Sequence, residues 1–225
     1  MKKYLFDPHV HTMEASTCGK IHATEICHMY KDLGYDGIVI TDHYYDGFFD
    51  SLGEICWREK IKKYSAGYYS AREEGEKIGL KVFQGIEFRT RFSPHDFLVY
   101  GLDEDFLILN EKLYLKNIAE FKEIASENGA VVYQAHPFRP GMQPESPSVL
   151  DGIEVVNGNP RQNSQNELAV EFAKKNNLKM LSSSDAHQPE DIGNGGIFLP
   201  ELPIDIHYFV RILKCLGEND MKNMV

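Results

Sequence analysis

Short apolar runs alternate along the chain with longer segments of helical periodicity. The runs expected to form strands cover residues 4–6, 37–41, 81–86, 96–101, 130–134, 152–156, 179–184 and 196–199. The helical patterns between them cover residues 23–34, 59–79, 111–129 and 164–177. Three of these segments end at a glycine (Gly34, Gly79 and Gly129), the residue that most often ends a helix in the left-handed conformation.

The alternation of strands and helices predicts a largely parallel sheet with right-handed crossovers. About seven or eight such units favour a closed barrel over an open, doubly wound sheet. No GxGxxG or P-loop sequence follows the first strand, which argues against a nucleotide-binding open sheet. Because the sequence shows no repeat, low-complexity tract or flexible linker, we expect residues 1–225 to form a single domain.

Composition narrows the classes of protein that need to be considered. Hydrophobic residues make up 42% and charged residues 26%, as in ordinary globular proteins. The sequence has no apolar run long enough to span a bilayer and no signal-peptide pattern, so we expect a cytoplasmic protein without a membrane partner. The net charge of -10 argues against a long nucleic acid as partner, but not against a small phosphorylated molecule. Four cysteines without CxxC spacing predict neither a disulfide scaffold nor a zinc finger.

Histidines and acids follow five of the expected strands, at the point where each strand ends. They are His9 and His11, Asp42 and His43, Glu87, His136, and Asp185 and His187. The carboxyl ends of barrel strands share one face, so we expect these side chains to meet there. A single histidine after a strand is more often a structural residue than a ligand. Five strand ends that each deliver His, Asp or Glu to one face instead indicate a site.

The spacing within two of these groups points to metal ions. His9/His11 and Asp185/His187 are each separated by one residue, so in an extended chain each pair projects to one side. Burying this many imidazoles and carboxylates is costly unless a cation satisfies them. Mixed His, Asp and Glu ligands favour Mn²⁺, Zn²⁺ or Fe²⁺ over Ca²⁺. One tetrahedral site needs about four ligands, and the sequence offers more candidates than that. We therefore expect more than one metal ion, with the carboxylate of Glu87 or Asp185 bridging two of them.

These motifs, in this order, resemble the PHP (polymerase and histidinol phosphatase) family. The resemblance is carried by HVHT, GYDGIVITDH, QGIEF, QAHPFRP and SSSDAHQPEDIG, which run from residue 7 to about residue 193. It implies an α/β fold, a distorted (β/α)7 TIM-like barrel, with two or three divalent transition metal ions. It also implies hydrolysis of phosphate esters. By position, the metal ligands it implies are His9, His11, His43, Glu87 as the bridging carboxylate, His136, Asp185 and His187.

The sequence departs from the family pattern after HVHT, where many relatives carry an Asp or His near a Ser. The segment MEASTCG offers Glu14 or Cys18 instead. Glu14 is the preferred interpretation, because a carboxylate is the commoner substitute. Cys18 is the alternative, either as a soft ligand or as an ordinary small residue. Relatives often have a histidine near His95, for which a ligand or substrate contact and a plain loop residue are equal alternatives.

A phosphate ester also needs positive charge from the protein. Arg139 follows His136, and Arg161 follows the strand at 152–156, so both are expected on the face that carries the histidines. For Arg161 a pairing with a surface acid is an equal alternative. Arg89 and Arg91 are weaker candidates.

As mechanism, we expect a metal-activated hydroxide to attack phosphorus. A protonated His187 or His95 would help the leaving group to depart, with Asp185 as a further catalytic residue. The expected function is therefore that of a small-molecule phosphomonoesterase, similar to a histidinol phosphatase. The alternatives are a phosphodiesterase or exonuclease acting on nucleotides or nucleic-acid ends, and a non-catalytic metal-binding module.

Overall fold

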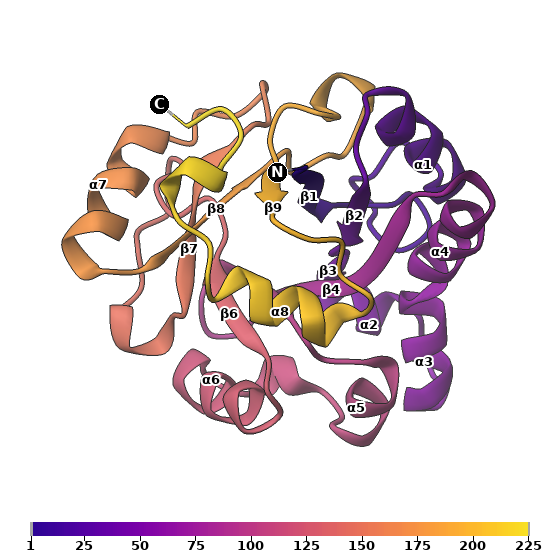
Figure 1. The fold of residues 1–225 in the computed structure, drawn as a ribbon. Helices are drawn as coiled ribbons and strands as arrows, with labels where there is room; N and C mark the ends of the chain where they lie inside the picture. Colours follow the sequence, from indigo (N-terminus) through magenta and orange to yellow (C-terminus); the bar gives the residue numbers. More distant parts are fainter. Residues whose placement is uncertain (1, 225) are drawn as a thin grey trace.

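The computed structural model describes residues 2–224, which form one mixed sheet wrapped into a barrel with helices outside (Figure 1). The strands are β1 (Tyr4–Val10), β2 (Gly37–Ile40), β3 (His43–Tyr44), β4 (Lys81–Arg89), β5 (Asp96–Tyr100), β6 (Val131–Gln134), β7 (Gly152–Asn157), β8 (Lys179–Ser183) and β9 (Ile197–Leu199). All eight strands expected from the apolar runs are present, and the two-residue strand β3 is added.

The sheet follows the order β8-β7-β6-β5-β4-β2-β1-β9, with β3 pairing to β4. A parallel bridge between Val10 and Ala186, just after β8, brings the first and last barrel strands together, so the barrel is nearly closed. β9 runs antiparallel to the amino-terminal half of β1. The expectation of a distorted TIM-like barrel is confirmed.

The distortion lies mainly at β5, which runs antiparallel to both of its neighbours, β4 and β6. Only residues 90–95 separate β4 from β5. A link this short forms a hairpin, whereas a parallel crossover needs about a dozen residues or more. The sheet is therefore parallel on both sides of β5, with one reversed strand between.

The helices surround the barrel, except for α8, which lies across one of its ends. They are α1 (Ala23–Asp32), α2 (Asp46–Ser51), α3 (Trp57–Tyr64), α4 (Ala66–Ile78), α5 (Glu104–Leu109), α6 (Ile118–Glu127), α7 (Asn166–Asn176) and α8 (Ile206–Leu213). The single helix expected over 59–79 is instead two helices, α3 and α4, which meet at Ser65. The helix expected over 111–129 begins only at α6, where Asn117 and Glu120 form a capping box. Among the described residues, no helix is long and apolar enough to cross a membrane.

Three glycines end helices as expected. Gly34, Gly79 and Gly129 have φ angles of 79°, 72° and 77°, in the left-handed region where a side chain is disfavoured. Each is followed within a few residues by the next strand or strand-leading segment, so these turns return the chain to the sheet.

The helix α8 lies across the amino-terminal opening of the barrel (Figure 1). Its fully buried Phe209 packs on Phe6, Phe83 and Tyr100, with ring centroids 5.9, 6.0 and 5.7 Å away. These partners come from β1, β4 and β5, so one aromatic residue connects strands from both halves of the sheet. With this end filled by apolar side chains, the polar groups collect at the opposite end.

Replacing Phe209 with alanine is expected to lower the free energy of unfolding by about 3–5 kcal/mol, the usual cost of a large cavity in a core. Urea denaturation followed by circular dichroism measures this. The exposed neighbour His207 in the same helix provides the control, since His207→Ala removes no buried contact and should change stability by less than about 0.5 kcal/mol. Equal effects of the two changes would contradict the packing role of Phe209.

Candidate metal centre

The carboxyl-terminal end of the barrel gathers the histidines and acids that the sequence singles out. His9 and Glu87 lie within β1 and β4, and the others lie at strand ends or in the residues directly after them. Three groups of side chains have ligand atoms within 4.8 Å of one another: His9, His11 and Asp185; His11, His43 and His187; and His43, Glu87 and Asp96. The face expected from the strand ends therefore exists.

The innermost group surrounds the two Nε2 atoms of His9 and His11, which lie 3.0 Å apart. Oδ1 of Asp185 lies 3.3 Å from the first and 3.5 Å from the second. The carboxylate of Glu87 reaches both imidazoles at 3.4 Å. Two ring nitrogens and two carboxylates, all fully or almost fully buried, thus converge on one point.

The opposite ring nitrogens show which atoms carry protons. Nδ1 of His9 lies 2.9 Å from the carboxylate of Glu154, so it donates a proton there. Nδ1 of His11 lies 3.3 Å from the hydroxyl oxygen of Ser16, whose own proton goes to Asp42 at 2.7 Å, so this nitrogen also donates. In their neutral forms, both imidazoles would then turn Nε2 lone pairs toward each other and toward carboxylate oxygens. Such an arrangement is unfavourable unless a cation lies between them.

The pKa values reflect this crowding. Burial alone would lower the pKa of His9, but the charges of Asp185 and Glu87 raise it well above its usual value. Burial and the neighbouring His187 and His43 lower the pKa of His11 well below its usual value. Burial would raise the pKa of Glu87, but the charges of His43 and His9 lower it well below its usual value. The centre therefore holds ionised carboxylates against imidazoles that cannot all be protonated.

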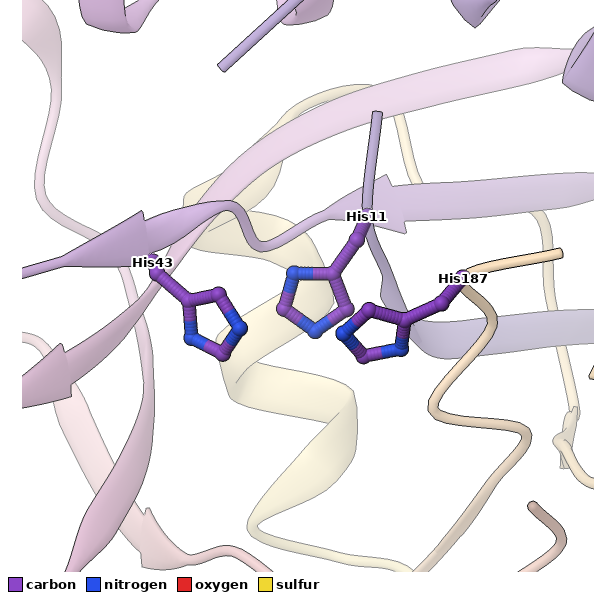
Figure 2. Close-up of side chains that lie close together, drawn as sticks. All are labelled: His11, His43 and His187. Carbon is purple, nitrogen blue, oxygen red and sulfur yellow. The ribbon is translucent and has the colours of Figure 1, made fainter. Parts of the chain in front are cut away.

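Three imidazoles form a second group nearer the mouth (Figure 2). The ring centroids of His11 and His187 lie 4.1 Å apart, and those of His11 and His43 lie 4.4 Å apart. Nδ1 of His187 lies 2.9 Å from the carbonyl oxygen of Asp185, to which it donates, so its Nε2 is left as an acceptor. The three rings come from the residue after β1, from β3 and from the segment after β8, which the barrel brings together.

The structure places Cys18, rather than Glu14, beside this second group. Burial would raise the pKa of the Cys18 thiol, but hydrogen bonds to His187 and His43 lower it to about 6. Glu14 instead accepts a hydrogen bond from the backbone N–H of Ala23, the first residue of α1, at 3.2 Å and pairs with His22. The structure thus places the Glu14 carboxylate at the start of α1, where it caps the helix, and places the Cys18 thiol beside the imidazoles.

The third group adds a residue that the sequence reasoning missed. Asp96, the first residue of β5, is buried near Glu87 and His43, and its Oδ2 lies 3.9 Å from Nε2 of His136. Nε2 of His136 lies 3.1 Å from Glu87. Nδ1 of His136 is buried without a hydrogen-bond partner among the described residues, whereas Oε2 of Glu87 lies 2.5 Å from Nδ1 of His43. A buried ring nitrogen without a partner, next to a cluster of carboxylates and imidazoles, fits residues that bind a metal ion.

Two residues of the centre have a strained backbone. His136 and Asp185 have φ angles of 29° and 52°, in a region that side chains rarely occupy. The N–H of His136 donates to Glu154 at 2.7 Å, and the side chain of Asp185 accepts from Arg139 at 2.6 Å. These bonds hold both residues in conformations that turn their side chains inward.

Buried carboxylates behind the ligand positions were also missed. Glu154, in β7, accepts hydrogen bonds from His9, from the backbone of His136, and from Asn157 and Ser183. Asp7, in β1, accepts from the backbone N–H of His9. A signal was available, because both acids stand inside apolar strand patterns where a carboxylate needs a partner.

The other candidate site residues, Arg139, Arg161 and His95, contact three different acids. Arg139 reaches the centre through its bond to Asp185. Arg161 instead forms two hydrogen bonds to Asp191, at 3.1 and 2.6 Å, which matches the alternative of pairing with an acid. Nδ1 of His95 lies 2.7 Å from Glu145, and His95 belongs to none of the three groups found in residues 2–224.

Comparisons with known proteins agree with this fold. Residues 163–211 match a family model described as PHP-associated. A two-domain protein from Bacteroides vulgatus, containing a predicted PHP-like metal-dependent phosphoesterase, matches with a TM-score of 0.64 and 21% identity over 95% of this chain. The match covers 63% of that protein, so this chain spans less than two thirds of its length.

Two further structures match over nearly the whole length of both chains. A proposed metal-dependent phosphoesterase from Bifidobacterium adolescentis has a TM-score of 0.56 and 18% identity, covering 95% of this chain and 97% of that one. An amidohydrolase from Chromobacterium violaceum, with bound sulfate and no metal, has a TM-score of 0.56 and 14% identity, covering 93% and 96%. No curated protein sequence gives a significant match. Residues 163–211 thus resemble a PHP-associated segment, and the whole barrel is similar in fold to structures described as metal-dependent phosphoesterases, one of them PHP-like.

Proposed function

We propose that this protein is a metal-dependent hydrolase that cleaves small phosphomonoesters. The observation that supports the proposal best is the convergence of the Nε2 atoms of His9 and His11 with the carboxylates of Asp185 and Glu87. Nitrogen and oxygen donors in this mixture suit divalent transition metals such as manganese, zinc or iron. Structures similar in fold include a predicted and a proposed metal-dependent phosphoesterase, which favours phosphate esters as substrates.

The three groups suggest how the ligands divide. His9, His11 and Asp185, with the neighbouring Glu87, would hold one ion. His43 and His187, with the adjacent Cys18 thiol, would hold a second. Glu87, Asp96 and His136 would complete a third position, with Glu87 shared between sites. Ions bound there would act as Lewis acids on a phosphoryl oxygen and activate water for attack on phosphorus.

Arg139 is suited to hold the phosphoryl group. Its Nη2 donates to Asp185 at 2.6 Å, which fixes the guanidinium at the edge of the centre. Its Nε is buried without an acceptor among residues 2–224. A phosphoryl oxygen would satisfy this N–H and receive its charge-assisted hydrogen bond as negative charge develops.

Proton donation to the leaving group falls to His95 rather than His187. His187 is part of the second group of imidazoles, where it would bind metal through Nε2. His95 lies outside that group and is oriented by Glu145, as a general acid requires.

The size of the opening favours small substrates. A cavity of about 140 Å³ leads to the centre and is lined by Cys18, His43 and Glu87 among others. Its volume suits a phosphoryl group better than a segment of nucleic acid. The net charge of -10 also repels long polyanions.

Hydrolysis assays with manganese-reconstituted protein test the proposal. We expect turnover of p-nitrophenyl phosphate to exceed that of bis-p-nitrophenyl phosphate and of a 3′-labelled oligonucleotide. Treatment with EDTA should abolish turnover, and manganese should restore it. A screen of phosphorylated metabolites then identifies the substrate. Preferential cleavage of the diester or the oligonucleotide would replace our proposal with that of a phosphodiesterase, and metal binding without any turnover would indicate a non-catalytic module.

The role of Cys18 as a ligand gives a spectroscopic prediction. A cobalt(II)-loaded protein should show near-ultraviolet sulfur-to-cobalt charge-transfer absorption, because a thiolate beside two imidazoles binds soft and borderline ions. Cys18→Ser should lose this band, whereas Cys56→Ser, at an exposed free cysteine, should keep it. Persistence of the band in Cys18→Ser would exclude Cys18 from the site.

A further inference from the structure

The cavity of about 140 Å³ beside the metal centre has one cationic side chain in its wall. That side chain is Arg89, the last residue of β4, and it faces the same space as Cys18, His43 and Glu87. Arginine in the wall of a small cavity next to a cluster of candidate metal ligands raises the question of which anion it would meet there.

Arg89 is held rigidly. It stands opposite Asp96 in the antiparallel pairing of β4 and β5. Its Nε and Nη2 each donate to a different oxygen of Asp96, both at 2.7 Å. The Arg89 guanidinium carbon also lies 5.9 Å from the centroid of the Tyr45 ring, which lines the same cavity. A side chain fixed in this way loses little rotamer entropy when a ligand binds.

One edge of the guanidinium remains open. Asp96 occupies the edge formed by Nε and Nη2. The edge formed by Nη1 and the second Nη2 proton has no hydrogen-bond partner among residues 2–224, and the side chain is 39% exposed. A guanidinium can bind two anionic groups at once, one on each edge, and its planar fork matches two oxygens of a phosphoryl group.

We propose that Arg89 binds the non-bridging oxygens of the substrate's phosphoryl group. This inference rests on the function proposed above, and it adds a phosphoryl-binding residue to that site. The phosphoryl group would lie in the cavity between Arg89 and the imidazole of His43. Asp96 would then have two roles: its carboxylate orients Arg89, and it also belongs to the third group of candidate ligands.

Arg91 is a matched control two residues further along the chain. Its Nε donates to Asp46 at 2.8 Å, and its guanidinium carbon lies 6.0 Å from the centroid of the Tyr114 ring. It therefore shares the ion pair and the aromatic neighbour of Arg89, but it does not line the cavity. An effect that needs only the loss of an arginine guanidinium from an ion pair would also appear at Arg91.

Isothermal titration of inorganic phosphate into manganese-reconstituted protein tests the inference. We expect Arg89→Lys, which keeps the charge but not the fork, to weaken phosphate binding by at least about 10-fold, the loss of one charge-assisted hydrogen bond. Arg91→Lys should bind phosphate within about two-fold of the wild type. Metal content, measured by mass spectrometry, should be unchanged in both. Arg89→Gln serves as a second variant if the lysine variant folds poorly.

The outcomes separate this inference from the proposed function. Phosphate binding by Arg89→Lys equal to that of the wild type would overturn it, as would a loss of metal, which would assign Arg89 a structural role through Asp96. Phosphate binding that depends on Arg89, in a protein that hydrolyses no phosphomonoester, would support the anion site and reject the proposed reaction. In an active enzyme, Arg89→Lys should lower kcat/KM for p-nitrophenyl phosphate in parallel with phosphate affinity.

Discussion

Replacing Asp185 with asparagine is expected to remove bound metal and to lower phosphomonoester turnover by more than about 100-fold. Changing a residue that only orients a ligand costs about 10- to 100-fold, and Asp185 is itself a candidate ligand. Its Oδ1 lies 3.3 Å from Nε2 of His9 and 3.5 Å from Nε2 of His11, so an amide there would place a neutral group among lone pairs that need a cation. Metal analysis and turnover of p-nitrophenyl phosphate measure both effects.

Glu190 provides the control for Asp185. It lies in the same loop, is exposed, and contacts only the side chain of Gln188 and the Asn194 amide through its own backbone. Glu190→Gln makes the same change from carboxylate to amide and should keep full metal content and activity. Circular dichroism should show both variants folded. Normal metal content and turnover in Asp185→Asn would remove the basis of the proposed function.

The barrel could be predicted because each of its strands is a short apolar run between helical patterns. The closing turns carry their own signals, as Gly34, Gly79 and Gly129 show. The pattern did not show the direction of each strand. β5 resembles the parallel strands of the sheet in sequence, but the short loop 90–95 makes it antiparallel to β4. The break between α3 and α4 at Ser65 could not be predicted either, because the helical periodicity of the sequence continues through it.

The ligand positions could be predicted from a simple geometric rule, that strand ends of a barrel share one face. That rule places His9, His11, His43, His136 and Asp185 together, and the structure brings them there. It says nothing of the residues that hold the ligands. Glu154 lies within its strand rather than at the strand end, as a single acid in an apolar run, so the rule does not select it.

The choice between Glu14 and Cys18 shows where residue chemistry misleads. A carboxylate is the commoner ligand, but the chain between residues 12 and 22 folds into turns that carry Glu14 to the start of α1. Cys18 is brought to His43 and His187 instead. Spacing within an irregular loop does not determine where a side chain points, so the sequence alone could not decide this position.

Replacing Glu154 with glutamine should weaken metal binding by about 10- to 100-fold without touching a candidate ligand. Burial would raise the pKa of Glu154, but the charge and hydrogen bond of His9 lower it, so the group stays ionised. As an anion it only accepts hydrogen bonds, from Nδ1 of His9 at 2.9 Å and from the backbone of His136 at 2.7 Å. A glutamine presents an NH₂ group to one of these donors, so either the imidazole of His9 flips or the strained backbone of His136 relaxes.

The two results differ in a way that can be measured. A flip of His9 turns its protonated nitrogen toward the centre and weakens metal binding at all temperatures, whereas relaxation of His136 also lowers the free energy of unfolding by about 1–3 kcal/mol, the usual cost of an unsatisfied buried group. Metal titration and urea denaturation of the metal-free protein separate them, with Glu167→Gln, an exposed acid on α7, as control. If Glu154→Gln binds metal as the wild type does, Glu154 is not needed to orient the imidazole of His9. Its hydrogen bond to Nδ1 would then not be what turns Nε2 of His9 toward the centre.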